Sequence, residues 1–174
     1  MDQREAEELI AGAVGESSGV WADLGAGTGT FTRALRALLP SESRIYAVDN
    51  DPAAIAALQG IGKGVIPVQG DFSKTFDLPE APLDGMLLAN ALHFVRDQEV
   101  VLRRLVSLLR PGGRVVVIEY DRRAASRWVP WPMNAGAWLK LARTAGLENP
   151  RITARRPSMY AGELYVGVAE RSDG

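Results

Sequence analysis

Short apolar runs along the chain alternate with segments whose apolar residues recur every three or four positions. The runs are typical of strands, and the periodic segments are typical of amphipathic helices. By this pattern we expect seven strands, at 20–24, 44–49, 65–69, 83–89, 114–120, 150–156 and 162–169. We expect helices at 2–14, 30–39, 52–58, 97–109 and 134–145. Alternating strands and helices predict a parallel sheet covered on both faces.

Details of the pattern predict how the sheet ends. The last two expected strands have no helix between them, so they should pair as a hairpin with one strand antiparallel. Pro67 lacks the N–H that a central strand donates, so 65–69 should be an edge strand. Asp51 followed by Pro52 is a typical helix start. The expected fold is α/β, a doubly wound seven-stranded sheet that is mostly parallel, with one antiparallel strand near the C-terminus.

Length and composition narrow the class of protein. The 174 residues suffice for one domain with a full core, so 1–174 should be a single domain. No apolar run approaches the roughly 18 residues of a membrane span, and the acidic start of the chain is unlike a secretory signal. We therefore expect a cytoplasmic protein. With no cysteine and one histidine, the sequence favours neither a disulfide framework nor a metal site.

Charge is distributed unevenly along the chain, although the net charge is −1. Residues 1–100 carry 7 Lys and Arg against 15 Asp and Glu, whereas 101–174 carry 13 against 6. Solvated helix faces explain such a pattern. The alternative is a positive rim near a substrate entrance, which would favour an anionic substrate. The overall balance lacks the strongly basic character of a dedicated nucleic-acid binder.

The segment 20–30 joins the first strand to a helix through Gly25, Gly27 and Gly29. Glycines let a ligand approach the main chain closely, and the helix start offers unpaired backbone N–H groups. In open α/β sheets, ligands bind outside the carboxyl ends of the strands, where strand order reverses. We therefore expect a nucleotide or nucleoside site at this turn.

Polar residues also follow the next three strands, namely Asp49, Asp71 and Asn90. Asp49 comes 20 residues after Gly29, the spacing at which a carboxylate can accept both ribose hydroxyls. Taken alone, the glycines and this acid would equally suggest a nicotinamide dinucleotide. The GxGxxG fingerprint fails, however, because Thr30 stands at its third glycine.

The sequence DLGAGTG at 23–29 resembles the first motif of class I S-adenosylmethionine-dependent methyltransferases. Agreement continues, in the same order and spacing, with VD at 48–49, GDF at 70–72, NALHF at 90–94 and LRPGGR at 109–114. The chain is similar to the type 11 branch of this family from about residue 18. The resemblance implies a Rossmann-like fold, S-adenosylmethionine as cofactor, and direct in-line methyl transfer to a small-molecule acceptor.

The resemblance also implies roles for individual residues. Asp23 would face the amino-acid end of the cofactor, Asp49 would accept the ribose hydroxyls, and Asp71 would accept the adenine amino group. Asn50 departs from the pattern, because an apolar residue often lies against adenine there. The expected cofactor contacts are Asp23, Gly25, Ala26, Gly27, Thr28, Asp49, Asn50, Asp71, Phe72, Asn90 and Ala91. Phe72 would pack at the ring edge or belong to the core.

His93, the only histidine, lies just past the fourth strand and is the candidate catalytic residue. Imidazole can accept a proton near neutral pH, so His93 could be a general base. The alternative is that His93 caps the following loop or bonds a backbone carbonyl.

The expected substrate-binding residues are Tyr120, Trp128 and Trp131, on the ligand side of the fifth strand. The two tryptophans could wall a pocket or form a lid. They could equally seal the sheet edge or form a homodimer contact. Three arginines of the same loop could attract a carboxylate or phosphate on the acceptor: Arg122, Arg123 and Arg127.

Two other functions stay open at this point. A relative of the same fold could bind the cofactor or a nucleoside without catalysis, as a regulatory module. A nicotinamide-dependent oxidoreductase is disfavoured by Thr30 and by the motif at Asp71. The sequence NALH at 90–93 differs from the Asn-Pro-Pro-aromatic tetrad of amino-directed nucleic-acid methylases, which argues against base nitrogens as acceptors.

Overall fold

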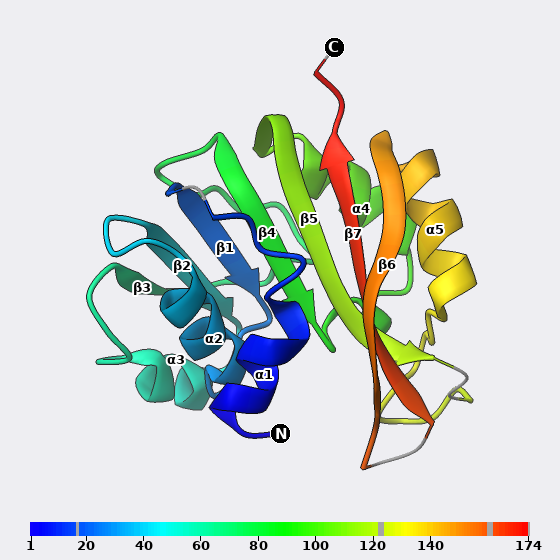
Figure 1. Ribbon diagram of the computed structural model, residues 1–174, viewed down its shortest axis with the longest axis horizontal. Helices are drawn as coiled ribbons and strands as arrows, with labels where there is room; N and C mark the ends of the chain where they lie inside the picture. The colour runs from blue at the N-terminus through cyan, green and yellow to red at the C-terminus, as the bar shows by residue number, and fades with distance from the viewer. Residues whose placement is uncertain (17, 122–123, 160–161, 174) are drawn as a thin grey trace.

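The computed structural model describes residues 1–16, 18–121, 124–159 and 162–173. In this part of the chain one sheet holds every strand: β1 (Val20–Leu24), β2 (Arg44–Asp49), β3 (Val65–Gln69), β4 (Leu83–Ala89), β5 (Leu109–Asp121), β6 (Leu147–Pro157) and β7 (Glu163–Arg171). The strand order is β3-β2-β1-β4-β5-β7-β6 (Figure 1). β7 runs in the opposite direction to the other six strands, so its pairings with β5 and β6 are antiparallel and the remaining pairings are parallel. The predicted fold class, the C-terminal hairpin and the edge position of β3 are confirmed.

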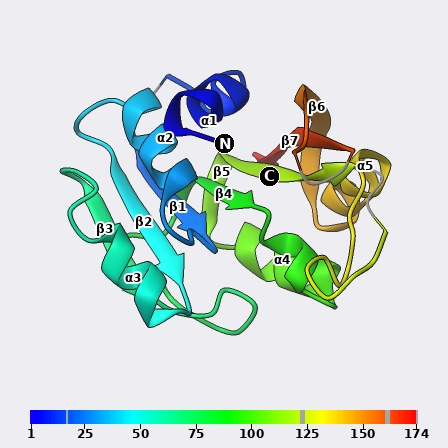
Figure 2. The same ribbon diagram turned by 90° about the horizontal axis from the view of Figure 1, so that it is seen from below.

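Helices cover both faces of this sheet: α1 (Gln3–Ile10), α2 (Thr30–Leu38), α3 (Pro52–Leu58), α4 (Gln98–Val106) and α5 (Ala135–Thr144), with a 3₁₀ turn η1 (Leu92–Phe94). Figure 2 shows α1 and α2 on one side of the sheet and α4 and α5 on the other. Within the described ranges, none of the helices has the length and apolar character needed to cross a bilayer.

The central strands are apolar on both faces because each face has its own helical layer. In β4, Leu87 packs with the α1 and α2 layer, while its neighbours Met86 and Leu88 pack with the α4 and α5 layer. In β5, Val116 and Val117 divide between the two layers in the same way. This alternation follows from the two-residue period of a strand. Each such fully buried side chain stabilises the fold by about 1.5–3 kcal/mol.

Local side-chain chemistry begins the helices where the sequence predicts. Asp51 accepts the N–H of Ala53 at 2.9 Å, with Pro52 in the first turn, as expected. Asp2 and Glu5 form a reciprocal capping box at the start of α1. These caps satisfy backbone donors that a helix leaves unpaired at its start.

Four predicted boundaries differ from the structure by three or more residues. The first helix ends at Ile10 instead of 14, because tight turns follow in which Ala13 and Val14 both donate to the Ile10 carbonyl. The fourth helix ends at Val106, and β5 begins at Leu109. There the N–H of Leu83 bonds the Leu108 carbonyl, so the Pro-Gly-Gly segment extends the sheet through a bulge. β6 begins at 147 instead of 150, because Leu147 already pairs with Arg171 at the end of β7.

Candidate functional site

The glycine turn after β1 is fastened to the end of β2. The N–H groups of Gly25 and Ala26 both donate to the Val48 carbonyl, at 2.9 and 3.0 Å. Gly25 has φ +77, and a Cβ there would lie 2.8 Å from Cβ of Ala91. A side chain at Gly25 would therefore meet both backbone strain and a neighbour, so only glycine fits this close approach.

Asp49, at the end of β2, holds the same turn. Its Oδ2 accepts the N–H of Gly27 at 2.8 Å, and its Oδ1 accepts the N–H of Asp51 at 2.9 Å. The predicted ribose-binding carboxylate thus also fixes the glycine turn against the helix that follows β2. Sequence reasoning missed this second role.

Asp71, just past β3, is held by the turn that follows it. Its Oδ1 accepts the N–H of Ser73 at 3.0 Å and the Ser73 hydroxyl at 2.5 Å, and Nζ of Lys74 lies 3.3 Å from its Oδ2. Above all the Ser73 hydroxyl holds the pKa of the Asp71 carboxyl below its usual range. Asp71 therefore stays an ionised acceptor at neutral pH.

Asp23, at the end of β1, is buried with one oxygen unsatisfied. Its Oδ2 accepts the Thr32 hydroxyl at 2.6 Å, whereas its Oδ1 has no hydrogen-bond partner among the described residues. Burial raises the pKa of the Asp23 carboxyl to about 7; the bond from Thr32 opposes this rise and the charge of Asp49 adds to it. A buried acceptor without a donor costs roughly 1–3 kcal/mol, so this position suits a ligand that brings a donor.

Asn90, which follows β4, presents a second acceptor of this kind. It lies in the left-handed region, with φ +50, and its Oδ1 has no partner within the described part of the chain. Non-glycine residues in this conformation concentrate at functional sites.

Two adjoining cavities open at the carboxyl ends of these strands. The first, which we call the Asp23 cavity, has a volume of about 400 Å³, and the second, the Asp71 cavity, about 540 Å³. They share Gly25, Gly27 and Asn90. Volumes of this size suit small molecules.

The residues predicted as cofactor contacts all line one of these cavities. The Asp23 cavity is lined by Asp23, Gly25, Ala26, Gly27, Thr28 and Asn90. The Asp71 cavity is lined by Gly25, Gly27, Asp49, Asn50, Asp71, Phe72, Asn90 and Ala91. The structure therefore brings the ends of the first four strands into one continuous site.

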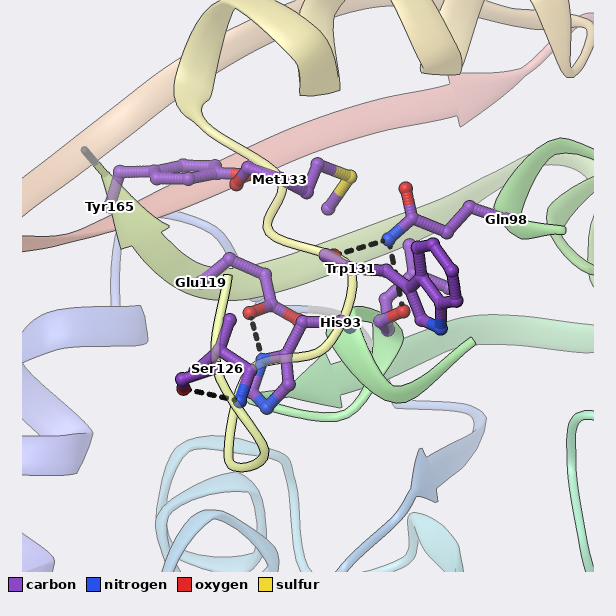
Figure 3. A network of polar contacts seen from close by, with 9 residues as sticks. His93, Gln98, Glu119, Ser126, Trp131, Met133 and Tyr165 are labelled. Carbon is purple, nitrogen blue, oxygen red and sulfur yellow. Dashed lines mark hydrogen bonds and ion pairs between the residues drawn. The ribbon is translucent and has the colours of Figure 1, made fainter. Parts of the chain in front are cut away.

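His93 lies apart from both cavities. Its side chain is 3% exposed, and a hydrogen bond of 2.6 Å joins Nδ1 to Oε2 of Glu119, near the end of β5. The backbone N–H of His93 also donates to Glu119, at 3.1 Å, and Figure 3 shows the ring facing this carboxylate. The described lining of the cavities does not include His93. Its general-base role stays a prediction that this geometry does not support.

Of the three predicted substrate-binding residues, one lines a cavity and two do not. Tyr120 lines the Asp23 cavity, while Trp128 and Trp131 line neither cavity and are 63% and 44% exposed. The N–H of Trp131 donates to the His93 carbonyl at 3.0 Å, so this loop packs on η1 (Figure 3). The guanidinium of Arg127 lies 4.4 Å from the ring of Trp128. Arg122 and Arg123 lie outside the described residues.

Sequence reasoning missed the far wall of the Asp23 cavity. Glu5 comes from α1, Phe31 from α2, and Arg156, Met159 and Leu164 from the C-terminal hairpin. No motif links these positions. The predicted pairing of the last two strands was the only available signal that the hairpin lies beside the central strands. The Asp71 cavity gains Ser73, Phe94 and Val95, each within a few residues of a predicted contact.

The fold and site define a doubly wound α/β domain with two joined cavities at the carboxyl ends of its parallel strands. Residues 22–117 match the methyltransferase domain family, which is more than half of the chain. The chain therefore belongs to this methyltransferase domain family, as the sequence motifs indicated.

Individual relatives agree with this assignment. The ubiquinone/menaquinone biosynthesis C-methyltransferase UbiE of Pasteurella multocida is 30% identical over 106 residues, which cover 58% of this chain and 39% of that protein. This chain thus spans less than half the length of the curated relatives it matches.

Solved structures extend the likeness to nearly the whole chain. The 1,6-didemethyltoxoflavin-N1-methyltransferase of Burkholderia thailandensis, with bound 1,6-didemethyltoxoflavin and S-adenosylhomocysteine, has a TM-score of 0.75 and 26% identity. That match covers 98% of this chain and 78% of the other. A methyltransferase of Thermotoga maritima has a TM-score of 0.78 at 18% identity, covers 98% and 90% of the two chains, and supports the fold.

Proposed function

We propose that this chain binds S-adenosylmethionine and methylates a small-molecule acceptor. The observation that carries the proposal is the pair of joined cavities, with the unpartnered oxygens of Asp23 and Asn90 in their walls. One cavity takes the nucleoside, and the other takes the amino-acid end and the acceptor. Family membership and the relative that holds S-adenosylhomocysteine support this reading.

The Asp71 cavity fits an adenosine. Asp49 accepts the ribose hydroxyls there, since each of its oxygens already takes a backbone N–H and retains a further lone pair. Asp71 stays ionised and accepts the adenine amino group. Phe72, Ala91 and Val95 supply apolar surface for the ring.

The Asp23 cavity fits the amino-acid end. An ammonium group brings several N–H donors and a positive charge. Oδ1 of Asp23 and Oδ1 of Asn90 accept such donors, which removes the cost of leaving both oxygens unpaired. The absence of a Cβ at Gly25 and Gly27 keeps the main chain close to the bound molecule.

When bound, S-adenosylmethionine supplies a methyl group on a cationic sulfur, activated for direct in-line displacement. The chain contributes walls that hold the acceptor in place and exclude water. Positioning of this kind supplies roughly 7–11 kcal/mol in the best-oriented reactions. The apolar and aromatic residues Phe31, Tyr120 and Leu164 form these walls.

Binding is tested first, by calorimetric titration with S-adenosylhomocysteine and with NAD. We expect S-adenosylhomocysteine to bind and NAD to give no heat of binding. Asp49→Ala removes an acceptor from the cavity and should weaken S-adenosylhomocysteine at least tenfold. Asp51→Ala, two residues away, removes only a helix cap and should cost about 1 kcal/mol of stability with affinity unchanged. Equal binding of NAD would contradict the proposal.

Turnover is tested by incubating the protein with methyl-labelled S-adenosylmethionine and a metabolite extract. Label in a new small molecule, absent with Asp49→Ala, is the expected result. Cofactor binding without transfer across such extracts would favour the non-catalytic module instead. A homodimer, which would cover the open end of the cavities, stays a prediction that sedimentation velocity can test.

A further inference from the structure

The Asp23 cavity carries a charged side chain to which the proposed binding of the ammonium group and the nucleoside gives no role. Arg156, near the end of β6, is the only Lys, Arg or His among the described residues that line either cavity. Its Nη2 donates to Oε1 of Glu5 in α1, and its Nη1 lies 3.4 Å from the Glu5 carbonyl oxygen. One ion pair therefore connects the first helix to the C-terminal hairpin across the cavity wall.

Arg156 can leave Glu5 for another anion at little cost in free energy. The side chains of Arg156 and Glu5 are 34% and 37% exposed, and pairs with such access to water contribute only about 0–1 kcal/mol. A second group also donates to Glu5, since its Oε2 accepts the N–H of Asp2 at 2.9 Å. If Arg156 turns to another anion, Glu5 keeps a hydrogen bond and solvent contact, so the exchange costs little.

The surroundings of Arg156 indicate the shape of that anion. Phe31 and Tyr120 bring aromatic rings to the cavity, and Met159 and Leu164 bring flexible apolar side chains. Rings and thioethers pack well against flat aromatic molecules. A planar guanidinium binds a carboxylate through two parallel hydrogen bonds. The cavity has a volume of about 400 Å³, which the acceptor would share with the amino-acid end of the cofactor.

We infer that the acceptor is a flat aromatic molecule with an anionic group, and that Arg156 binds this group in place of Glu5. This inference rests on the proposed function, since it fills the acceptor half of the same site. It moves the anion-binding role, which the sequence placed on the arginines after β5, to an arginine of the hairpin. The positive charge of Arg156 is then paired in both states, with Glu5 before the acceptor binds and with the anionic group of the acceptor afterwards.

The test uses matched probes in the presence of saturating S-adenosylhomocysteine. The probes are one- and two-ring aromatic carboxylates, such as salicylate and hydroxynaphthoate, each paired with its neutral amide. Calorimetry on the wild type should show each bound carboxylate at least tenfold tighter than its amide. Arg156→Gln should remove this preference. Glu5→Gln, which cannot form the ion pair, should tighten carboxylate binding severalfold.

Arg155→Gln is the matched control, because Arg155 pairs with Asp121 and Glu163 and lines neither cavity. It should keep the carboxylate preference. Equal affinity for acids and amides, retention of the preference in Arg156→Gln, or failure of every carboxylate to bind would overturn the inference. S-adenosylhomocysteine affinity is measured separately in each variant. If the wild type does not bind S-adenosylhomocysteine, the proposed function is contradicted. If it binds S-adenosylhomocysteine but binds the carboxylates no more tightly than the amides, only the role of Arg156 is contradicted.

Discussion

The Thr32 hydroxyl donates to one oxygen of Asp23 at 2.6 Å, and the other oxygen of this buried carboxylate has no partner among the described residues. Selection for stability alone would not leave Oδ1 of Asp23 buried without a hydrogen-bond donor, because burial opposes ionisation of the carboxyl group. The arrangement suits a site that binds a cationic group, which would donate to Oδ1 of Asp23. It also makes the protein without its cofactor sensitive to pH in a direction that can be stated.

Stability of the cofactor-free protein should fall as pH rises from about 4 to 7. Asp23 ionises near 3.8 without its folded surroundings, whereas in the folded protein its pKa is about 7. Between these values the folded state holds a proton that the unfolded state has lost, so the free energy of unfolding decreases with pH. The penalty is complete above pH 7 and is on the order of 4 kcal/mol. Urea unfolding from pH 4.5 to 8 measures it.

Other groups also titrate in this range, so Asp23→Asn is the reference. The amide has no charge to bury, and any cost of its unpaired N–H is the same at every pH. The difference in unfolding free energy between variant and wild type should therefore shift in favour of the variant as pH rises. S-adenosylhomocysteine, which brings an ammonium group, should bind the wild type more tightly at pH 7.5 than at 5.5. A pH-independent difference between the two proteins would show that Asp23 ionises normally.

Gly25→Ala should weaken S-adenosylhomocysteine at least tenfold, because the new Cβ would lie 2.8 Å from Cβ of Ala91 inside the site. Gly60→Ala separates this effect from backbone strain. Both glycines have φ +77, yet a Cβ at Gly60 meets no atom within 4 Å. Each variant should lose about 1–2 kcal/mol of stability from the left-handed conformation, and Gly25→Ala should lose more because its Cβ also meets Ala91. Only Gly25→Ala should lose affinity, and equal affinities would indicate that the turn does not touch the bound molecule.

The sequence predicts the carboxyl-end residues well because the topology of parallel strands brings them together. Asp23, Asp49, Asp71 and Asn90 each follow a strand whose apolar run is easy to recognise. Once the strands lie parallel and adjacent, their carboxyl ends share one edge of the sheet. The prediction therefore required only the order and period of the strands, and no knowledge of side-chain packing.

Contacts between distant segments were not predictable in this way. Glu5 and Arg156 are 151 positions apart, and Glu119 and His93 are 26 apart. Neither pair belongs to a periodic pattern, and each depends on which face of its strand or helix turns toward the site. In the sequence, Glu119 is one residue of an otherwise apolar strand. In the structure, the parallel pairing of β4 and β5 brings its carboxylate to η1. Side-chain orientation, more than fold, limited the sequence analysis.

The Glu119 carboxylate binds both the ring and the backbone N–H of His93, so we expect this pair to position η1, whose Phe94 lines the Asp71 cavity. His93→Gln should lower the unfolding free energy by about 1–3 kcal/mol, because a buried acceptor loses its partner. Once a methyl acceptor is known, turnover should fall less than tenfold and the slope of its pH profile should be unchanged. A general base predicts a loss of roughly 10²–10⁴-fold instead. Glu119→Gln is the companion variant: a positioning pair predicts that it resembles His93→Gln in stability and in S-adenosylhomocysteine affinity. A large loss of turnover in His93→Gln with cofactor affinity intact would restore His93 as the catalytic residue.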